Sequence, residues 1–286
     1  DFLRPIEYDE LRGSAQVKSC LLFCALNTPG ITKIRAVPSR DHTERLFKFL
    51  NIPIKIRREK KFDIIKIRGE NQYNGFDYKI PGDISSSAFF IVLTLLSKNS
   101  KILIKNVNVN KSRTGIIDIL KKMNANIRLI NKKMYNGEDI ADIFVKSGKS
   151  LKSINCAKEM NSRAIDEFLL IFLVCAKAKG ISYFNNIGEL RHKECDRLKF
   201  SSNLLKMIGI KVKETSNSLK IYGNPRLELN GNYEIKNYIK DHRVCMMSCI
   251  AALVLGGTWK IHDNDSINTS FPKFFSKLKS LGAKIN

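Results

Sequence analysis

The segment LKMIGIKVKE at residues 205–214 reads as the end of an amphipathic helix, a glycine break and an alternating strand. Three further segments have this layout: KFLNIPIKI (48–56), KKMNANIRL (121–129) and LKSLGAKI (278–285). Along the chain the four segments are spaced by 73, 85 and 73 residues. Such a nearly fixed period indicates four copies of one structural unit.

Each copy can be followed backwards to a polar cap and an apolar helix. These first helices are SAQVKSCLLFCAL from Ser14, DISSSAFFIVLTLL from Asp83, SRAIDEFLLIFLVCAKA from Ser162 and DHRVCMMSCIAALVL from Asp241. A short strand, a second helix and the closing strand follow, and three copies add a last strand. The second helices begin at SRDHTE (39–44), NKSRTG (110–115), GELRHKECDRLK (188–199) and NTSFP (268–272). The pattern predicts an α/β (α+β) fold of repeated β-α-β-α-β-β units.

Composition places the chain among globular proteins. Its 286 residues are 43% hydrophobic, and no apolar run reaches the eighteen or so residues of a spanning helix. The seven cysteines lack any CxxC spacing, and no histidine accompanies the Cys20/Cys24 or Cys245/Cys249 pairs. We therefore expect reduced thiols, no metal site and a cytoplasmic location. The chain starts at Asp1 rather than Met, which we interpret as a processed chain or a fragment.

The net charge of +23 suits a nucleic-acid binder or an enzyme for anionic substrates, and it also reflects a composition rich in lysine. The basic residues are spread along the chain, and no cluster of aromatic and basic residues suggests a surface for stacking bases. We therefore expect neither a nucleic-acid nor a membrane partner.

Polar residues recur at the helix starts. Gln16, Asp166, His242 and Arg243 lie in or beside the first turn of the first helix of their copies. Helix N-termini carry unsatisfied N–H groups and a partial positive charge, so several of them together would form an anion site. The alternative is that each polar cluster only caps its own helix.

Ten motifs resemble the family of 5-enolpyruvylshikimate-3-phosphate synthase, which joins phosphoenolpyruvate to shikimate 3-phosphate. They run in order over essentially the whole chain: SAQVKS (14–19), NTPGIT (27–32), SRDHTER (39–45), PGDISSSAFF (81–90), SRTGIIDIL (112–120), GEDIADI (137–143), AIDEF (164–168), ELRHKECDRL (189–198), DHRVCM (241–246) and SFPKFF (270–275). The SAQVKS form looks like one bacterial branch of the family.

The resemblance implies enolpyruvyl-transferase-type domains with a cleft between two domains, and no metal or organic cofactor. Family members have six repeats, and this chain resembles the last four. Residues 1–79 would be the remnant, the last repeat, of the first domain, and residues 80–286 would be the second domain with three repeats. We therefore expect an N-terminally truncated monomer that is inactive alone.

The resemblance also assigns the site. Shikimate 3-phosphate would contact Ser14, Ala15, Gln16, Arg40, Asp166 and Lys193, and phosphoenolpyruvate would contact Gln16, Arg197 and Arg243. Asp166 would accept the proton of the 5-hydroxyl, and Glu194 would be the second acid–base group. A guanidinium can bind a carboxylate or phosphate through paired hydrogen bonds, which suits both arginines.

Several neighbours receive structural interpretations. Glu167 is interpreted as structural. His242 is interpreted as orienting Arg243 or as structural, and Asp41, His42 and Glu44 could simply cap the helix. His192 and Cys195 depart from the family pattern, in which an apolar residue and a serine are usual. Two other functions stay open: the related transferase that acts on UDP-N-acetylglucosamine, and a basic binding module without catalysis.

Overall fold

A computed structural model describes residues 3–69 and 73–285. The chain divides into two compact units. Unit 1 comprises residues 1–81, 108–113 and 132–141, and unit 2 comprises residues 82–107, 114–131 and 142–286. The helices of the described residues are too short or too polar to cross a membrane.

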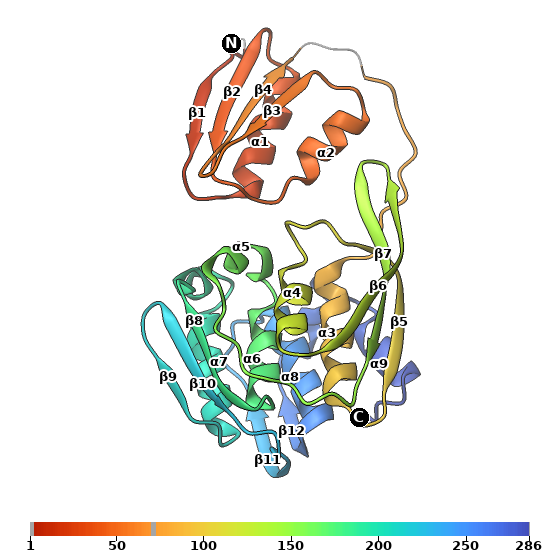
Figure 1. Cartoon of the computed structure of the whole chain (residues 1–286), viewed down its shortest axis with the longest axis vertical. Coiled ribbons are helices and arrows are strands. Elements are labelled where there is room, and N and C mark those ends of the chain that lie inside the picture. The colour runs from red at the N-terminus through yellow and green to blue at the C-terminus, as the bar shows by residue number, and fades with distance from the viewer. Residues whose placement is uncertain (1–2, 70–72, 286) are drawn as a thin grey trace. The chain divides into compact units, whose positions relative to one another are not determined.

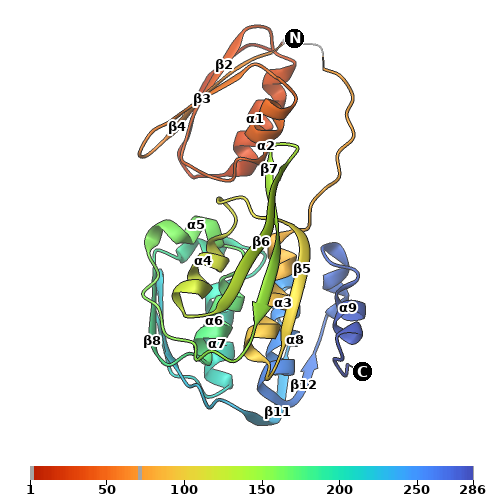
Figure 2. The same ribbon diagram turned by 45° about the vertical axis from the view of Figure 1, so that its right-hand side comes forward.

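Unit 1 is a sheet with two helices. Its elements are β1 (Glu7–Glu10), α1 (Ala15–Leu26), β2 (Ile31–Ala36), α2 (His42–Phe49), β3 (Ile54–Arg58) and β4 (Asp63–Arg68). The strand order is β1-β2-β4-β3, with β1 and β2 parallel and the other pairs antiparallel. Both helices lie on the same face of the sheet (Figure 2). Their apolar residues form one core with the alternate residues of β2 and β4, among them Leu22, Phe47 and Ile65.

Unit 2 contains the remaining elements. Its helices are α3 (Ile84–Leu96), α4 (Gly115–Lys122), α5 (Asn161–Ala164), α6 (Phe168–Ala176), α7 (Arg197–Met207), α8 (His242–Leu255) and α9 (Phe274–Ser280), with 3₁₀ turns η1 (Lys158–Met160), η2 (Gly188–His192) and η3 (Asn264–Thr269). Its strands are β5 (Lys101–Asn108), β6 (Asn126–Tyr135), β7 (Glu138–Lys146), β8 (Gly180–Asn185), β9 (Val212–Glu214), β10 (Ser218–Gly223), β11 (Leu229–Ile235) and β12 (Gly256–Ile261). The ends of β5, β6 and β7 fall in the residues assigned to unit 1.

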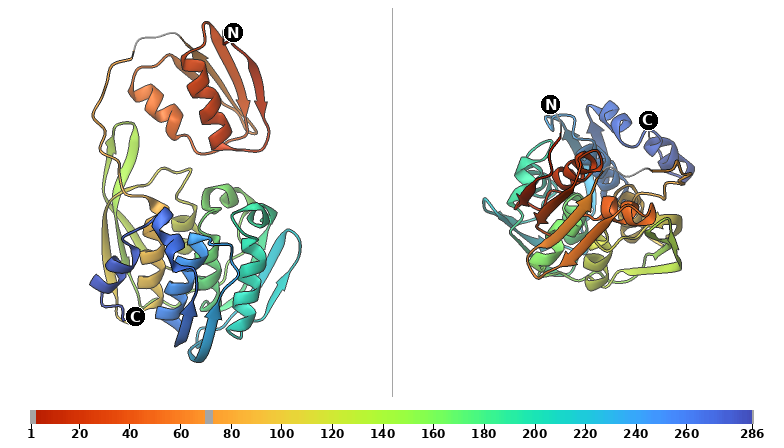
Figure 3. Two further views of the ribbon diagram at one scale, coloured as in Figure 1. Left: turned by 180° about the vertical axis from the view of Figure 1, so that it is seen from behind. Right: turned by 90° about the horizontal axis from the view of Figure 1, so that it is seen from above.

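The helices of unit 2 fill its middle. Figure 1 shows α3, α6 and α8 side by side, with the sheets β5-β7-β6, β8-β10-β9 and β11-β12 around them. Every residue of α6, FLLIFLVCA, is buried. A helix that is apolar on all sides belongs in a core. The C-terminal helix α9 lies beside α3 (Figure 3, left), where Phe274 contacts Phe89 and Phe90 edge to face.

The structure confirms the predicted fold class of repeated mixed α/β units. In unit 1, α1, β2, α2, β3 and β4 follow in the predicted order, and unit 2 repeats this order from α3 and again from α5 and α6. The leading strands, which the sequence patterns did not locate, are β1 and β11. Each pairs in parallel with the next strand of its unit, β2 or β12, across α1 or α8.

Three local predictions were wrong. The helix predicted to run on from Ser162 is interrupted between α5 and α6, because residues 165–167 form a turn in which Glu167 N–H donates to the Ala164 carbonyl. Residues 283–285, predicted as a closing strand, follow the turn after α9 without joining a sheet. The helix predicted at 268–272 starts later, at Phe274, after the 3₁₀ turn η3.

Candidate functional site

The predicted site residues of unit 2 gather around Arg197, the first residue of α7. Its side chain is only 2% exposed. Nε and Nη2 donate to the two carboxylate oxygens of Asp241, at 2.8 and 3.2 Å, and Nη2 also donates to Glu194 Oε2 at 2.6 Å. Nη1 lies 3.8 Å from Asp166 Oδ1. Carboxylates on three sides therefore fix the plane of this guanidinium.

Asp241 is the buried carboxylate that binds the Arg197 guanidinium and caps α8. It is the N-cap of α8, and its Oδ1 accepts from the main-chain N–H of Arg243 and of Val244. Burial by itself would raise the pKa of this carboxyl, but the hydrogen bonds and charge of Arg197 outweigh burial and lower the pKa. The sequence predicted Asp241 as the polar start of this helix, but it gave no sign of the ion pair with Arg197.

Asp166 lies in the turn between α5 and α6, just before the first turn of α6. Its carboxylate oxygens lie 3.8 Å from Arg197 Nη1 and 3.8 Å from Arg243 Nη2. Its main-chain carbonyl accepts from Arg243 Nη1 at 3.3 Å. A partly exposed carboxylate between two guanidinium groups can hold negative charge and accept a proton from a bound hydroxyl.

Lys193 and Glu194 follow the 3₁₀ turn η2. Lys193 Nζ pairs with Glu189 Oε1 at 2.8 Å, and the half-exposed Glu194 pairs with Arg197. Burial, assisted by Asp241, raises the pKa of the neighbouring Cys195 thiol to about 12, so this thiol is neutral at pH 7. This residue therefore offers no thiolate nucleophile.

The predicted site residues of unit 1 lie at two helix starts. Ser14 caps α1 by accepting from Val17 N–H, and Ala15 and Gln16 are the first residues of that helix. Arg40 is partly buried and lies two residues before α2 begins. The two helices are joined near these starts by a buried ion pair, Lys18 Nζ to Glu44 Oε1 at 2.6 Å.

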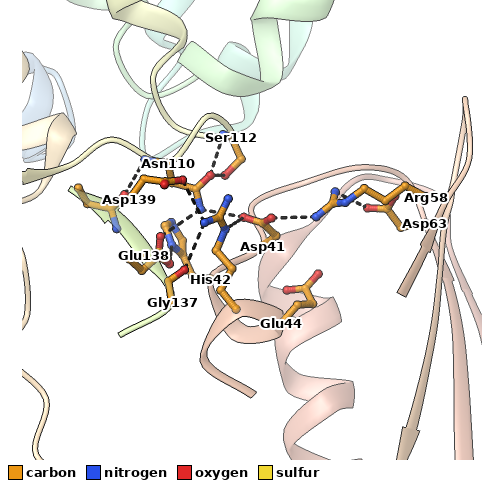
Figure 4. Close-up of polar contacts among 12 residues, drawn as sticks. Asp41, His42, Glu44, Arg58, Asp63, Asn110, Ser112, Gly137, Glu138 and Asp139 are labelled. Carbon is orange, nitrogen blue, oxygen red and sulfur yellow. Dashed lines mark hydrogen bonds and ion pairs between the residues drawn. The ribbon is translucent and has the colours of Figure 1, made fainter. Parts of the chain in front are cut away.

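A polar network surrounds the start of α2 (Figure 4). Asp41 accepts from Asn110 at 2.7 Å, from Arg58 at 2.8 Å and from Arg45 at 3.1 Å. These contacts outweigh burial and lower the pKa of Asp41. Asp41 is the N-cap residue of α2 as interpreted, but its side chain makes no cap hydrogen bond and contacts this network instead.

The network continues from Asn110 to Glu138, whose Oε2 accepts from Asn110 at 3.3 Å. Glu138 Oε1 pairs with His42 Nδ1 at 2.5 Å. Burial would raise the pKa of Glu138, but His42 outweighs burial and lowers it. His42 therefore contacts Glu138, and Glu44 makes an ion pair with Lys18, which their interpretation as capping residues did not foresee.

In unit 2 the structure thus brings Asp166, Glu194, Arg197 and Arg243 together, whereas Lys193 pairs with Glu189 beside them. Unit 1 holds Ser14, Ala15, Gln16 and Arg40. The expectation that both groups line one cleft stays a prediction. The described residues contain no group of three or more acidic, histidine or cysteine side chains arranged to hold a metal ion.

Repeated mixed α/β units arranged in this way match the fold of solved enolpyruvyl transferases. The family model for EPSP synthase (3-phosphoshikimate 1-carboxyvinyltransferase) matches residues 2–278. The chain belongs to this family.

Known relatives are similar over nearly the whole chain. The 3-phosphoshikimate 1-carboxyvinyltransferase of Petrotoga mobilis is 39% identical over 284 residues, 98% of this chain, and that of Ruthia magnifica is 38% identical over 289 residues, 99% of it. The chain spans 64% of the length of each of these relatives.

Solved structures agree with this placement. An EPSP synthase from Acinetobacter baumannii matches with a TM-score of 0.89 and 33% identity, covering 100% of this chain and 64% of that chain. The enolpyruvyl transferase NikO from Streptomyces tendae matches with a TM-score of 0.72 and 14% identity, covering 100% of this chain and 66% of that chain. This last likeness concerns the fold alone.

Proposed function

We propose that this chain carries part of the machinery that transfers the enolpyruvyl group of phosphoenolpyruvate to the 5-hydroxyl of shikimate 3-phosphate, releasing phosphate. The observation that carries the proposal is the placement of the Asp166 carboxylate between the guanidinium groups of Arg197 and Arg243. Such a site offers a proton acceptor beside groups that bind a carboxylate or a phosphate. Membership of the EPSP synthase family supports the choice of substrates.

In the proposed addition step, Asp166 takes the proton of the 5-hydroxyl while that oxygen attacks C2 of phosphoenolpyruvate. Glu194 delivers a proton to C3, which becomes a methyl group. In the elimination step, a proton leaves C3, the double bond re-forms and the C2–O bond to phosphate breaks. Glu194 is half-exposed and pairs with Arg197, so its side chain has room to reach a bound substrate.

The binding roles follow the charges of the substrates. Arg197, Arg243 and Gln16 would hold phosphoenolpyruvate. Shikimate 3-phosphate would be held by Ser14, Ala15, Gln16, Arg40, Asp166 and Lys193. The start of α1 supports this role because its N–H groups and the hydroxyl of Ser14 can donate to phosphate oxygens.

We also propose a cytoplasmic monomer without nucleic-acid or membrane partners. Its seven cysteines are free, which supports a reducing compartment. Light scattering of the purified chain would report its mass in solution, and a dimeric mass would contradict this proposal.

Phosphate release from the two substrates by the purified chain tests the catalytic proposal. Turnover by this chain would require both substrates and would fall by about hundredfold or more in Asp166→Ala, the usual loss for a general base. Asp265→Ala, which removes an exposed carboxylate paired with Lys240, is the control and should keep the wild-type rate. A wild-type rate near background would contradict catalysis by this chain and would support the expectation that residues 1–286 are inactive alone.

A further inference from the structure

Glu167 is a buried carboxylate that the proposed reaction does not use. Its side chain is 2% exposed, and it lies directly after Asp166, at the N-cap of α6. Removing a charge from water is unfavourable unless opposite charges or hydrogen-bond donors compensate. The contacts of Glu167 therefore show which groups compensate its buried charge.

Glu167 links three helices through one oxygen atom. Its Oε1 accepts a hydrogen bond from Ser85 Oγ, near the start of α3, at 2.5 Å. The same oxygen lies 3.8 Å from Nη1 of Arg243, in the first turn of α8. Because α3, α6 and α8 pack against one another, the carboxylate holds this guanidinium against a rigid part of the core.

Arg243 stands between two carboxylates. Nη1 faces Glu167 and also donates to the main-chain carbonyl of Asp166, while Nη2 lies 3.8 Å from Asp166 Oδ2. The guanidinium is thus equally far from Glu167 and from the Asp166 carboxylate. Without the charge of Glu167, Coulomb attraction would draw the guanidinium towards Asp166.

We propose that Glu167 is a positioning residue that sets the orientation of Arg243 towards phosphoenolpyruvate and keeps this arginine from closing onto Asp166. The inference rests on the proposed function, in which Arg243 binds phosphoenolpyruvate. Paired hydrogen bonds from a guanidinium require a fixed plane, so the residues behind the arginine affect binding without touching the substrate. Ser85 supports Glu167 by fixing its carboxylate.

Three variants test the inference. Glu167→Gln keeps the size of the side chain and an acceptor for Ser85 but removes the charge. Ser85→Ala keeps the charge and removes the support, and Glu159→Gln changes an exposed carboxylate on η1 as the matched control. Thermal unfolding checks that each variant folds, and ¹⁵N NMR follows the guanidinium signals of Arg243, assigned with Arg243→Lys.

In Glu167→Gln we expect faster rotation of the Arg243 guanidinium. If the wild-type chain turns over its substrates, we also expect a KM for phosphoenolpyruvate about tenfold higher, with kcat changed less than about threefold. The KM for shikimate 3-phosphate should stay within about twofold. Ser85→Ala should change the guanidinium rotation and the KM in the same direction but by less. This variant tests the inference even if Glu167→Gln fails to fold. Glu159→Gln should behave as wild type.

Two results would overturn the inference: guanidinium signals unchanged in both Glu167→Gln and Ser85→Ala, or equal rises in KM for both substrates. If the signals change while the wild-type chain turns over no substrate, the positioning role stands and catalysis by this chain alone fails. The NMR measurement needs no substrate, so the two failures are distinguishable.

Discussion

At the scale of single residues, Asp241 contributes to stability in two ways. Its buried carboxylate compensates the charge of Arg197 and caps α8. We predict that Asp241→Asn lowers the free energy of unfolding at pH 7 by about 3–5 kcal/mol, because one partner of a buried ion pair is left alone. Urea unfolding followed by circular dichroism measures this loss, with the exposed Asp265→Asn as control.

The same residue gives a prediction for pH. Arg197 lowers the pKa of Asp241 in the folded protein, so its stabilisation is complete above the unfolded pKa of about 3.9. The stabilisation is lost as the pH falls through the lower pKa of the folded state. The difference in free energy of unfolding between wild type and Asp241→Asn should therefore shrink below about pH 4. A difference that stays constant down to pH 2 would contradict the ion-pair explanation.

At the scale of elements, the sequence predicted what depends on local pattern. The first helices from Ser14, Asp83 and Asp241 form as expected, since a polar N-cap precedes an apolar run in each. The turn between α5 and α6 was missed because its residues suit a helix locally. Asp166 and Glu167 there contact Arg243 from another helix, and no local pattern reveals such a contact.

The missed strands and caps have a similar cause. Strand β1, EYDE, is mostly exposed and lacks an apolar alternation, and it forms by parallel pairing with β2. Asp41 and Glu44 have the spacing of capping residues at the start of α2, but their partners Asn110 and Lys18 lie on other segments. The candidate site was located by family resemblance, whereas its supporting contacts required the structure.

The ion pair that joins α1 and α2 gives a prediction about how two helices stabilise each other. Lys18 and Glu44 form a buried ion pair, and Ser19 and Thr43 are hydrogen-bonded beside it. Lys18→Met leaves the Glu44 charge alone and should cost about 3–5 kcal/mol. The double variant Lys18→Met/Glu44→Leu should recover most of this loss, because apolar replacements of similar volume avoid the desolvation penalty.

Urea unfolding of both single variants and the double variant completes a double-mutant cycle. Ser19→Ala is the control and should cost about 1 kcal/mol, the usual net worth of one hydrogen bond. Equal losses in the single and double variants would show that the pair contributes packing alone.

At the scale of the whole molecule, the residues that the structure describes form two separate apolar cores. One core joins Leu22, Phe47 and Ile65 in unit 1, and the other includes Phe172 and Phe274 in unit 2. Residues that pack in one core unfold together. We therefore expect the two units to unfold in separate transitions. The larger core should give the transition with the larger enthalpy, since enthalpy scales with the residues that unfold.

Scanning calorimetry with one core variant for each unit tests this expectation. Leu22→Ala should lower the midpoint temperature of the unit 1 transition only, because deleting a buried leucine side chain costs about 2–5 kcal/mol of stability. Phe172→Ala should lower the midpoint temperature of the unit 2 transition only, because this deletion costs about 3–5 kcal/mol of stability. A loss of about 1 kcal/mol shifts the midpoint of a small domain by roughly 4–8 °C, so both shifts are measurable. A single transition that moves equally in both variants would show that the two cores unfold as one.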